Sequence, residues 1–370
     1  MRRRDYDVLI VGAGLFGATL ANLLHEQGKR VLVVEKENEV GGIVRTNNVR
    51  GIEVHMFGAH IFKTSSKKVW DYITGIQPFI PFINSPITIS KGEVFNLPFN
   101  MNTFAKLWKG VVTPQDAMVK IHSQIGAEDL PEKIVTLEDY AISKVGREVY
   151  ERFIKGYTEK QWGKKCSELP KSVMRRIPIR YSYDNNYYDA EYQGVPKYGY
   201  TNLIYELLHG VDFMTNTDGK KFILDHRNIA DHVVYTGMID EFYGYMYGKL
   251  EYRSLRFEHD VKTSITNYQG NAVVNYADAD ILYTRSIEHC HFTKNYKSDT
   301  IVTYEYPEEY NGDNKPYYPV NTVKNDAMYN KYVRCAETDS IIFAGRLGSY
   351  KYTDMSDTIL NAMQLSEQLL

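Results

Sequence analysis

Cysteine is scarce in this 370-residue chain, and neither sign of charge is in excess. The three cysteines, at positions 166, 290 and 335, form no C-x-x-C pair, which argues against a disulfide framework or a zinc finger. This usage is typical of a reducing compartment, so we expect a cytoplasmic protein. The 44 basic residues nearly balance the 46 acidic ones, and a net charge of -2 gives no general attraction to nucleic acid or anionic membranes. Any anion-binding site must therefore be local.

Several catalytic motifs are also missing. The sequence contains no G-x-S-x-G, H-E-x-x-H or P-loop pattern, so nothing indicates a serine hydrolase, a zinc protease or a P-loop enzyme. The uncharged stretch Val8–Leu24 follows MRRR as in a signal peptide, but Asp5 and Asp7 intervene and no A-x-A-like site follows. The stretch is also too short and glycine-rich to indicate a membrane span.

Tyrosine, by contrast, is abundant, with 31 residues against 15 phenylalanines. A tyrosine combines a stacking face with a hydroxyl group, which suits a cleft that holds a nucleotide and a sugar. An ordinary soluble protein rich in tyrosine would have the same composition, and composition alone does not separate the two interpretations.

The stretch from residue 5 to residue 36 carries the strongest signal. Tyr6–Val11 predicts a buried strand, Ala18–Leu24 predicts a helix, and Arg30–Glu35 predicts a second strand that ends in an acid. Between the first strand and the helix lie three glycines with the spacing G-x-G-x-x-G. Strand, glycines, helix, strand and acid in this order indicate a dinucleotide-binding unit.

The glycine positions have separate physical roles. Gly12 permits the tight turn, Gly14 lets a pyrophosphate approach the backbone, and Gly17 lets helix and strand pack closely. The free N–H groups at the helix start face the phosphates. Glu35, 21 residues after Gly14, is placed to bind a ribose and argues against a 2′-phosphate. An acid followed by the Gly-Gly turn at 41–42 is typical of flavoproteins, so we expect permanently held FAD.

We predict an α/β protein with a discontinuous FAD-binding Rossmann-like domain, an inserted helical domain and an antiparallel β-sheet domain. The predicted boundaries are 1–80, 200–245 and 330–370 for the FAD-binding domain, 103–165 for the helical domain, and 81–102, 166–199 and 246–329 for the sheet domain, which holds the substrate.

Local patterns support these boundaries. Thr113 and Thr136 are typical helix starts, and Lys91-Gly92 indicates a hairpin turn. The apolar run Val233–Gly237 predicts a strand that returns to the FAD-binding domain. Alternating strands are predicted at Tyr252–Phe257, Ala272–Tyr276 and Thr300–Tyr306, and a final buried strand at Ser340–Ala344.

Ten segments spread along the chain resemble the bacterial UDP-galactopyranose mutase family in sequence and in order: GAGLFGA, GAHIFKT, KGYTEKQWGK, RRIPIRYSYDNNYY, VYTG, LEYRSLRFE, QGNAVVNYAD, YTRSIEH, KPYYPVN and GRLGSYKYTDM. The resemblance implies a FAD-dependent isomerase that interconverts the pyranose and furanose forms of a nucleotide-diphosphate sugar. Close relatives in the family rearrange UDP-N-acetylgalactosamine or dTDP-fucose. The implied setting is a cytoplasmic homodimer that supplies furanose sugars for polysaccharide biosynthesis, with neither nucleic acid nor membrane as a partner.

The resemblance also implies which residues act. Cofactor-binding residues are expected at Gly12, Gly14, Leu15, Phe16, Gly17, Glu35, Lys36, Gly42, His60, Ile61, Gly237, Arg346, Asp354 and Met355. Substrate-binding residues are expected at Asn84, Phe153, Tyr157, Thr158, Trp162, Arg176, Tyr187, Asn275, Arg285, Tyr318, Tyr352 and Asp354. Catalytic roles are expected for Arg176, Arg285, His60 and Lys63, and no metal is expected.

Within this set the family assigns distinct tasks. Arg176 and Arg285 bind the diphosphate with two tyrosines, and Tyr157 and Trp162 bind the uridine. Arg176 lies in a mobile loop, 164–179, that closes over the nucleotide. N5 of reduced FAD attacks the anomeric carbon, and the covalent flavin–sugar adduct opens and closes to the other ring size without net redox change.

One position departs from the family pattern. Relatives usually carry H-I-F-H-T, whereas this chain has Lys63 in place of the second histidine. Our hypothesis is that Lys63 shifts the sugar preference away from plain galactose, toward a 6-deoxy or N-acetylated sugar. Neither the choice between uridine and thymidine nor the physiological reductant follows from the sequence.

Other interpretations compete with these. An Arg-Arg pair such as Arg175-Arg176 is often a solvated face, and Cys166 has no evident base that would make it a nucleophile. His289-Cys290-His291, if on a strand, places two histidines on one face, but no further ligand has the spacing of a metal site. A flavin amine oxidase shares the glycine motifs but needs no pair of cleft arginines. An inactive nucleotide-sugar-binding homologue would have Lys63 as its lesion.

Overall fold

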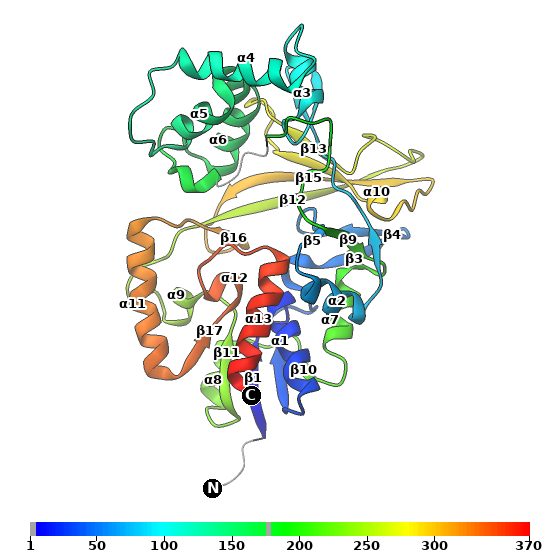
Figure 1. Ribbon diagram of the computed structural model, residues 1–370. Coiled ribbons are helices and arrows are strands. Elements are labelled where there is room, and N and C mark those ends of the chain that lie inside the picture. Colours follow the sequence, from blue (N-terminus) through cyan, green and yellow to red (C-terminus); the bar gives the residue numbers. More distant parts are fainter. Residues whose placement is uncertain (1–4, 175–178) are drawn as a thin grey trace.

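The glycine fingerprint follows one strand of a parallel sheet in the computed structural model, which describes residues 5–174 and 179–370 (Figure 1). Within these residues the sheet has five strands in the order β10-β2-β1-β11-β17, and all neighbours are parallel. The bounds are β1 Tyr6–Val11, β2 Val31–Val34, β10 Asp212–Met214, β11 Ala230–Tyr235 and β17 Ile341–Phe343. Distant segments meet in one sheet, which confirms the predicted Rossmann-like architecture.

Helices cover both faces of this sheet, which explains why β1 is apolar throughout. Val8 and Ile10 pack on one face with α1, α2, α7 and α13, whereas Leu9 and Val11 pack on the other with α8 and α9. Successive strand residues point to opposite faces, so a strand buried on both sides has few polar positions. The helices are α1 Leu15–Glu26, α2 Lys67–Ile76, α7 Gly199–Leu207, α8 Gly219–Asp225, α9 Ile239–Phe242 and α13 Met355–Leu369.

A second, larger sheet crosses the middle of the molecule (Figure 1). Its seven strands within the described residues have the order β16-β12-β15-β14-β13-β7-β8. They are β7 Ile87–Ser90, β8 Glu93–Asn96, β12 Tyr252–Lys262, β13 Val273–Tyr276, β14 Arg285–Glu288, β15 Thr300–Glu309 and β16 Pro316–Pro319. Neighbours are antiparallel, as predicted, except β13 and β7, which are parallel. Lys91 and Gly92 form the predicted hairpin turn, both with positive φ (52° and 76°).

A group of helices with its own core packs against one end of the second sheet (Figure 1). The helices are α3 Met101–Leu107, α4 Pro114–Gly126, α5 Leu137–Val149, the π-helical turn η2 Tyr150–Lys155 and α6 Gly156–Trp162. Both predicted helix starts are confirmed. The Thr113 side chain accepts from the Asp116 N–H in a capping box, and Thr136 accepts from the Asp139 N–H.

Shorter elements connect these parts. A three-stranded sheet has the order β5-β9-β6, and β3 pairs with β4. The bounds are β3 Thr46–Val49, β4 Ile52–His55, β5 Phe62–Thr64, β6 Phe79–Pro81, β9 Tyr192–Pro196, η1 Gly42–Val44, η3 Lys171–Met174, α10 Cys290–Thr293, α11 Val323–Asp339 and α12 Gly345–Gly348. No helix in the described part of the chain combines the length and the apolar character that crossing a membrane requires.

Candidate functional site

The carboxyl ends of the parallel strands meet at one edge of the first sheet, where ligands bind in open α/β sheets. At this edge β1 continues into the glycine turn, β2 into Glu35, β11 into residues 236–237 and β17 into residues 344–346. Thr236 Oγ1 donates a hydrogen bond of 2.7 Å to the carbonyl of Val11, so the turn after β11 is attached to the turn after β1. The site is therefore assembled from four separate segments of the chain.

The three fingerprint glycines meet different surroundings. A Cβ on Gly12 would lie 2.0 Å from Thr236 Oγ1, and a Cβ on Gly17 would lie 2.0 Å from the carbonyl oxygen of Gly12. Gly12 also has a φ of 106°, which favours glycine. A Cβ on Gly14 would meet no protein atom within 4 Å. Gly12 and Gly17 are thus required by packing, whereas the open space at Gly14 fits a ligand that approaches the backbone.

Glu35 lies beside this turn and is 7% exposed. Its two carboxylate oxygens accept from the backbone N–H groups of Ala13 (2.8 Å) and Glu37 (2.9 Å). Each oxygen keeps a lone pair for a further donor, such as a ribose hydroxyl. Gly42 faces Gly14, since a Cβ on Gly42 would lie 3.4 Å from the Gly14 Cα, whereas the Lys36 side chain is exposed.

The carboxyl-terminal segment closes the other side of the turn. A Cβ on Gly345 would lie 3.6 Å from the Phe16 side chain, so Phe16, which follows Leu15 at the start of α1, packs beside α12. Arg346, in α12, lies over the Tyr352 ring with its guanidinium carbon 5.7 Å from the ring centre. Asp354 is the N-cap of α13, directly before Met355, while Ile61 is buried and Gly237 packs against the Tyr235 ring.

A second set of polar groups surrounds Arg285, the first residue of β14. Its Nη2 donates to the Tyr157 hydroxyl at 3.1 Å, and its Nε lies 3.4 Å from the Glu305 carboxylate, which is 2% exposed. Burial acts to lower the pKa of Arg285, but Glu305, Tyr157 and Tyr318 outweigh it and hold the pKa well above its usual range. Arg285 is thus a charged guanidinium with free N–H groups for an anion.

An aromatic row connects this cation with the dinucleotide edge. The ring centres of Trp162 and Tyr318 are 6.4 Å apart, and those of Tyr318 and Tyr352 are 5.6 Å apart. The Arg346 guanidinium lies over the Tyr352 ring, so the row of side chains runs from Trp162 in α6 to Arg346 in α12. The row therefore spans the distance between the helical part and the first sheet.

The remaining predicted substrate residues are placed by strand register, backbone hydrogen bonds and packing. Asn275 on β13 is the register partner of Arg285, and the Asn84 carbonyl accepts from the Tyr187 N–H at 2.8 Å. Phe153 and Thr158 are 5% and 3% exposed, and Phe153 packs with Phe95 and Phe99 inside the helical core. Arg176 lies outside the described residues, as does residue 175, so their predicted roles remain predictions.

The two polar residues of the G-A-H-I-F-K-T motif have fixed partners. His60 Nδ1 donates to the Gly58 carbonyl at 2.8 Å, which leaves Nε2 as an acceptor in the neutral ring. Burial lowers the pKa of His60 to about 4, with Arg346 and Arg285 acting in the same direction. Lys63 Nζ lies 2.8 Å from Asp354 Oδ2 and 5.2 Å from the centre of the Tyr188 ring.

Three neighbours of the site were missed by the sequence analysis. They are Glu305 beneath Arg285, Tyr188 below Lys63, and Lys160, whose ammonium group contacts backbone carbonyls only. Tyr188 stands next to predicted Tyr187 and could have been included. Glu305 lies in a predicted strand, but only the register of β14 and β15 reveals that it faces Arg285.

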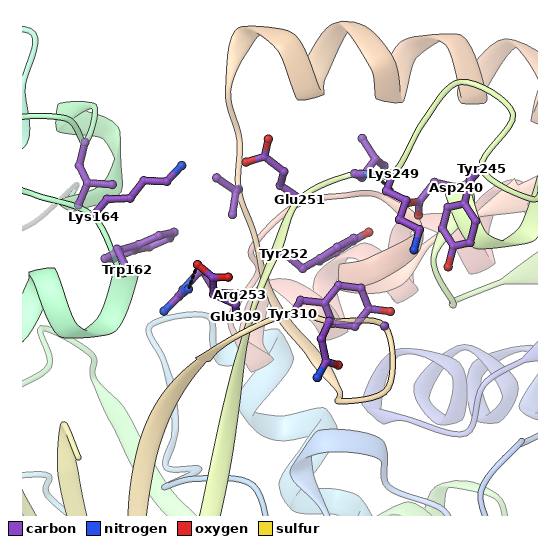
Figure 2. A pocket seen from close by; sticks show the side chains of 15 residues that line it. Trp162, Lys164, Asp240, Tyr245, Lys249, Glu251, Tyr252, Arg253, Glu309 and Tyr310 are labelled. Atoms are coloured by element: carbon purple, nitrogen blue, oxygen red, sulfur yellow. Dashed lines mark hydrogen bonds and ion pairs between the residues drawn. The ribbon is translucent and has the colours of Figure 1, made fainter. Parts of the chain in front are cut away.

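A pocket of about 370 Å³ adjoins the aromatic row at Trp162 (Figure 2). Figure 2 shows Trp162 and Lys164 on one side, Arg253 beside Glu309, and Tyr245 on the far side. Acidic and basic side chains alternate along its wall, and this pocket does not contain Arg285.

The histidine-rich segment after β14 does not form a strand. β14 ends at Glu288 and α10 begins at Cys290, so His289 and His291 do not share a strand face. Glu288, Cys290 and His291 do come together, with ligand atoms within 4.8 Å of one another. The Glu288 carboxylate, however, accepts from the N–H groups of Tyr268 and Gln269 and pairs with His291, which accounts for the cluster without an ion.

The fold defines a dinucleotide-binding α/β protein, and the adjoining cleft holds the charged guanidinium of Arg285. A family model for a Rossmann-like NAD(P)-binding domain matches residues 10–75, and one for UDP-galactopyranose mutase matches residues 152–352. A probable UDP-galactopyranose mutase of Klebsiella pneumoniae is 37% identical over 98% of this chain and 94% of its own. The dTDP-fucopyranose mutase of Escherichia coli is 34% identical over 97% of both chains.

A solved structure of reduced UDP-galactopyranose mutase has a TM-score of 0.74 and 14% identity, and covers 98% of this chain and 93% of its own. The chain belongs to the UDP-galactopyranose mutase family, a family of isomerases.

Proposed function

We propose that this protein is a FAD-dependent isomerase that interconverts the pyranose and furanose forms of a nucleotide-diphosphate sugar. The observation that carries the proposal is the aromatic row, which connects the Arg285 cleft with the dinucleotide edge. A diphosphate at Arg285 would leave its sugar within reach of a cofactor ring at that edge. Family membership supports the same reaction class.

The residues at the sheet edge fit FAD. Gly14 and the start of α1 would face the pyrophosphate, Glu35 the adenosine ribose, and residues 345–355 the other end of the cofactor. The open space at Gly14 and the remaining lone pairs of Glu35 support this fit. When bound in its reduced form, FAD supplies a nucleophilic ring nitrogen for the anomeric carbon, with no net redox change.

The protein's own contribution is electrostatic. Negative charge grows on the diphosphate when the C1–O bond breaks, and a guanidinium held in a fixed position stabilises that charge. Arg285 is held between Tyr157 and Glu305, so little reorganisation is needed at that moment. Arg176 would add a second guanidinium, and Tyr318 and Tyr352 would donate hydroxyl hydrogen bonds.

Neutral His60 is suited to accept a hydrogen bond. Its Nε2 is the free acceptor, because Nδ1 donates to a carbonyl. Burial and the nearby charges of Arg346 and Arg285 disfavour a further positive charge on the ring, so the pKa of His60 is depressed. His60 can therefore orient a hydroxyl of the sugar or the cofactor at neutral pH.

Lys63 is our candidate for the sugar preference. Its ammonium group is paired with Asp354, and both side chains are about one-third exposed at 33% and 34%. A lysine held there changes the charge and reach of a position that family members fill with histidine. We expect 6-deoxy or N-acetylated sugars to be preferred over plain galactose.

One experiment tests both the isomerase activity and the role of Lys63 in sugar preference. Dithionite-reduced protein is incubated with UDP-galactose, UDP-N-acetylgalactosamine or dTDP-fucose, and the furanose product is measured by chromatography. Turnover of any of the three supports the isomerase. A strong preference for UDP-galactose would contradict the role of Lys63, and the Lys63→His variant should then show an unchanged preference. Colourless protein that cannot be reconstituted with flavin would contradict the proposal as a whole.

Two alternatives have their own readouts. An amine oxidase would release hydrogen peroxide with an amine substrate, and it offers no reason for the Arg285–Tyr157–Glu305 arrangement. An inactive homologue would bind UDP without changing the sugar. The proposal includes a cytoplasmic homodimer, and the small, odd number of cysteines in the sequence supports a reducing compartment.

A further inference from the structure

Lys160 makes an unusual set of contacts near the cleft. Its Nζ lies 2.9 Å from the carbonyl oxygen of Tyr276, 2.8 Å from those of Asp278 and Ile281, and 3.2 Å from that of Tyr283. An ammonium group has three N–H donors, so four carbonyls surround it as they would surround a bound monovalent cation. The half-buried charge is thus held mainly by backbone dipoles.

Three of these carbonyls belong to the connection at residues 277–284, and the fourth, that of Tyr276, ends β13. Residues 277–284 join β13, which carries Asn275, to β14, which begins with Arg285. Tyr283, the last residue held by Lys160, stands two positions before Arg285. The conformation of this connection therefore sets where the Arg285 backbone enters the cleft.

Lys160 itself comes from the element that carries the partner of Arg285. Tyr157 and Lys160 both lie on α6, three residues apart and hence on one face of the helix. At the start of α6, a Cβ on Gly156 would lie 2.4 Å from the Ala277 carbonyl oxygen. Helix α6 and the 277–284 connection are thus in close contact at Gly156, and the Lys160 ammonium group joins them one helical turn later.

We propose that Lys160 is a positioning residue for the diphosphate site, because its ammonium group fixes the 277–284 connection to α6 and so sets the Arg285–Tyr157 pair. This role rests on the function proposed above for Arg285. In this role Lys160 contacts neither the substrate nor the cofactor and acts through Arg285. The neutral carbonyls alone repel one another at this spacing, so the connection needs a cation at its centre.

Burial lowers the pKa of Lys160 to about 8, while Asp278 and Asp280 act in the opposite direction. The cation is therefore the main form at neutral pH.

The test measures UDP affinity in Lys160→Met, which keeps the chain length and removes the charge. We expect the UDP dissociation constant to rise at least about tenfold, because a displaced guanidinium loses alignment with the phosphates. In an Arg285→Ala background the same substitution should have little further effect, since Lys160 acts through Arg285. A merely structural role would give the same loss in both backgrounds.

Ammonium ion offers a second readout. Lys160→Ala leaves the four carbonyls and a space at their centre, so ammonium chloride should restore UDP affinity, whereas tetramethylammonium, which cannot donate, should not. Lys155→Met is the matched control, because the Lys155 side chain is exposed and its ammonium group has no hydrogen bond to the described residues. Its UDP affinity should equal that of the wild type.

Amide hydrogen exchange of residues 277–284 keeps the test decisive if Lys160→Met folds poorly. The milder Lys160→Gln should then show faster exchange in this segment than the wild type. Unchanged exchange together with unchanged UDP affinity would overturn the proposal and leave the isomerase intact. A wild-type protein that binds neither UDP nor dTDP would overturn the proposed function and with it the role of Lys160.

Discussion

At the scale of single residues, Glu305 shows how a buried charge depends on its partner. It is 2% exposed, and it lies directly opposite Arg285 in the pairing of β14 with β15. Burial raises the pKa of Glu305, while Arg285 acts to lower it. The carboxylate therefore compensates the guanidinium in a place where neither would be stable alone.

We expect Glu305→Gln to lower the free energy of unfolding by about 3 kcal/mol, because it leaves the charge of Arg285 uncompensated. Urea unfolding measures this loss. Glu309→Gln is the control, since Glu309 is 90% exposed beside Arg253 and its loss should cost less than about 1 kcal/mol. Equal losses in the two variants would show that Glu305 does not compensate Arg285.

Two buried histidines, His55 and His289, and the partly buried His60 link stability to pH. His289 Nδ1 accepts from the His55 N–H, and His55 Nδ1 accepts from the His60 N–H, so both rings need a neutral Nδ1. Burial lowers the pKa of His60 to about 4 and that of His289 to about 3, and it also lowers that of His55. In the unfolded chain these rings take up protons near pH 6.5.

The unfolded state therefore binds more protons than the native state below pH 6.5, and stability falls as the pH falls toward the folded pKa values. We expect the free energy of unfolding to drop by about 2 kcal/mol or more between pH 7 and pH 5. Urea unfolding at the two pH values measures the drop. The His289→Gln variant should be less stable than the wild type at pH 7, but its free energy of unfolding should fall less steeply toward pH 5. An equally steep fall in the variant would show that His289 does not contribute to the pH dependence.

At the scale of elements, the glycines of the turn after β1 have different roles: Gly17 is needed for packing, whereas Gly14 is open to a ligand. Gly17→Ala would place a Cβ 2.0 Å from the Gly12 carbonyl oxygen, whereas Gly14→Ala would place one in open space. We expect Gly17→Ala to lower the unfolding midpoint of the cofactor-free protein and Gly14→Ala to leave it nearly unchanged. Gly14→Ala should instead weaken flavin retention during gel filtration. Full flavin retention by Gly14→Ala would exclude a phosphate at that backbone position.

The elements also show what the sequence could predict. β1, the β7–β8 hairpin and the helices capped by Thr113 and Thr136 followed from apolar runs and capping residues. α11 was missed, because only Asn325, Tyr332 and Ala336 of its residues are buried, so its sequence has no apolar stripe.

The candidate site was also predicted in part. Tyr318 and Tyr352 were predicted through the family resemblance, and the structure brings them together. Glu305 and Lys160 were missed because their partners are set by strand register and by a connection in another part of the chain. The assigned roles of these residues, and the domain boundaries, remain predictions.

At the scale of the whole molecule, the cysteines report on the integrity of the fold. Cys166 and Cys290 are fully buried, and burial raises the pKa of each to about 11, whereas Cys335 is partly exposed. We expect a thiol reagent at pH 8 to modify Cys335 in the native protein and the other two only after unfolding. Cys335→Ser should remove the fast reaction. A second fast thiol in that variant would contradict the described packing.

The parallel sheet has a consequence for biosynthesis. Its strands come from residues 6–34, 212–235 and 341–343, and α1 packs against α13 at residues 355–369. A nascent chain therefore cannot complete this sheet until nearly all of it has left the ribosome. Until then the apolar face of α1 stays uncovered, and a chaperone that shields such surfaces would have its longest engagement with the amino-terminal segment.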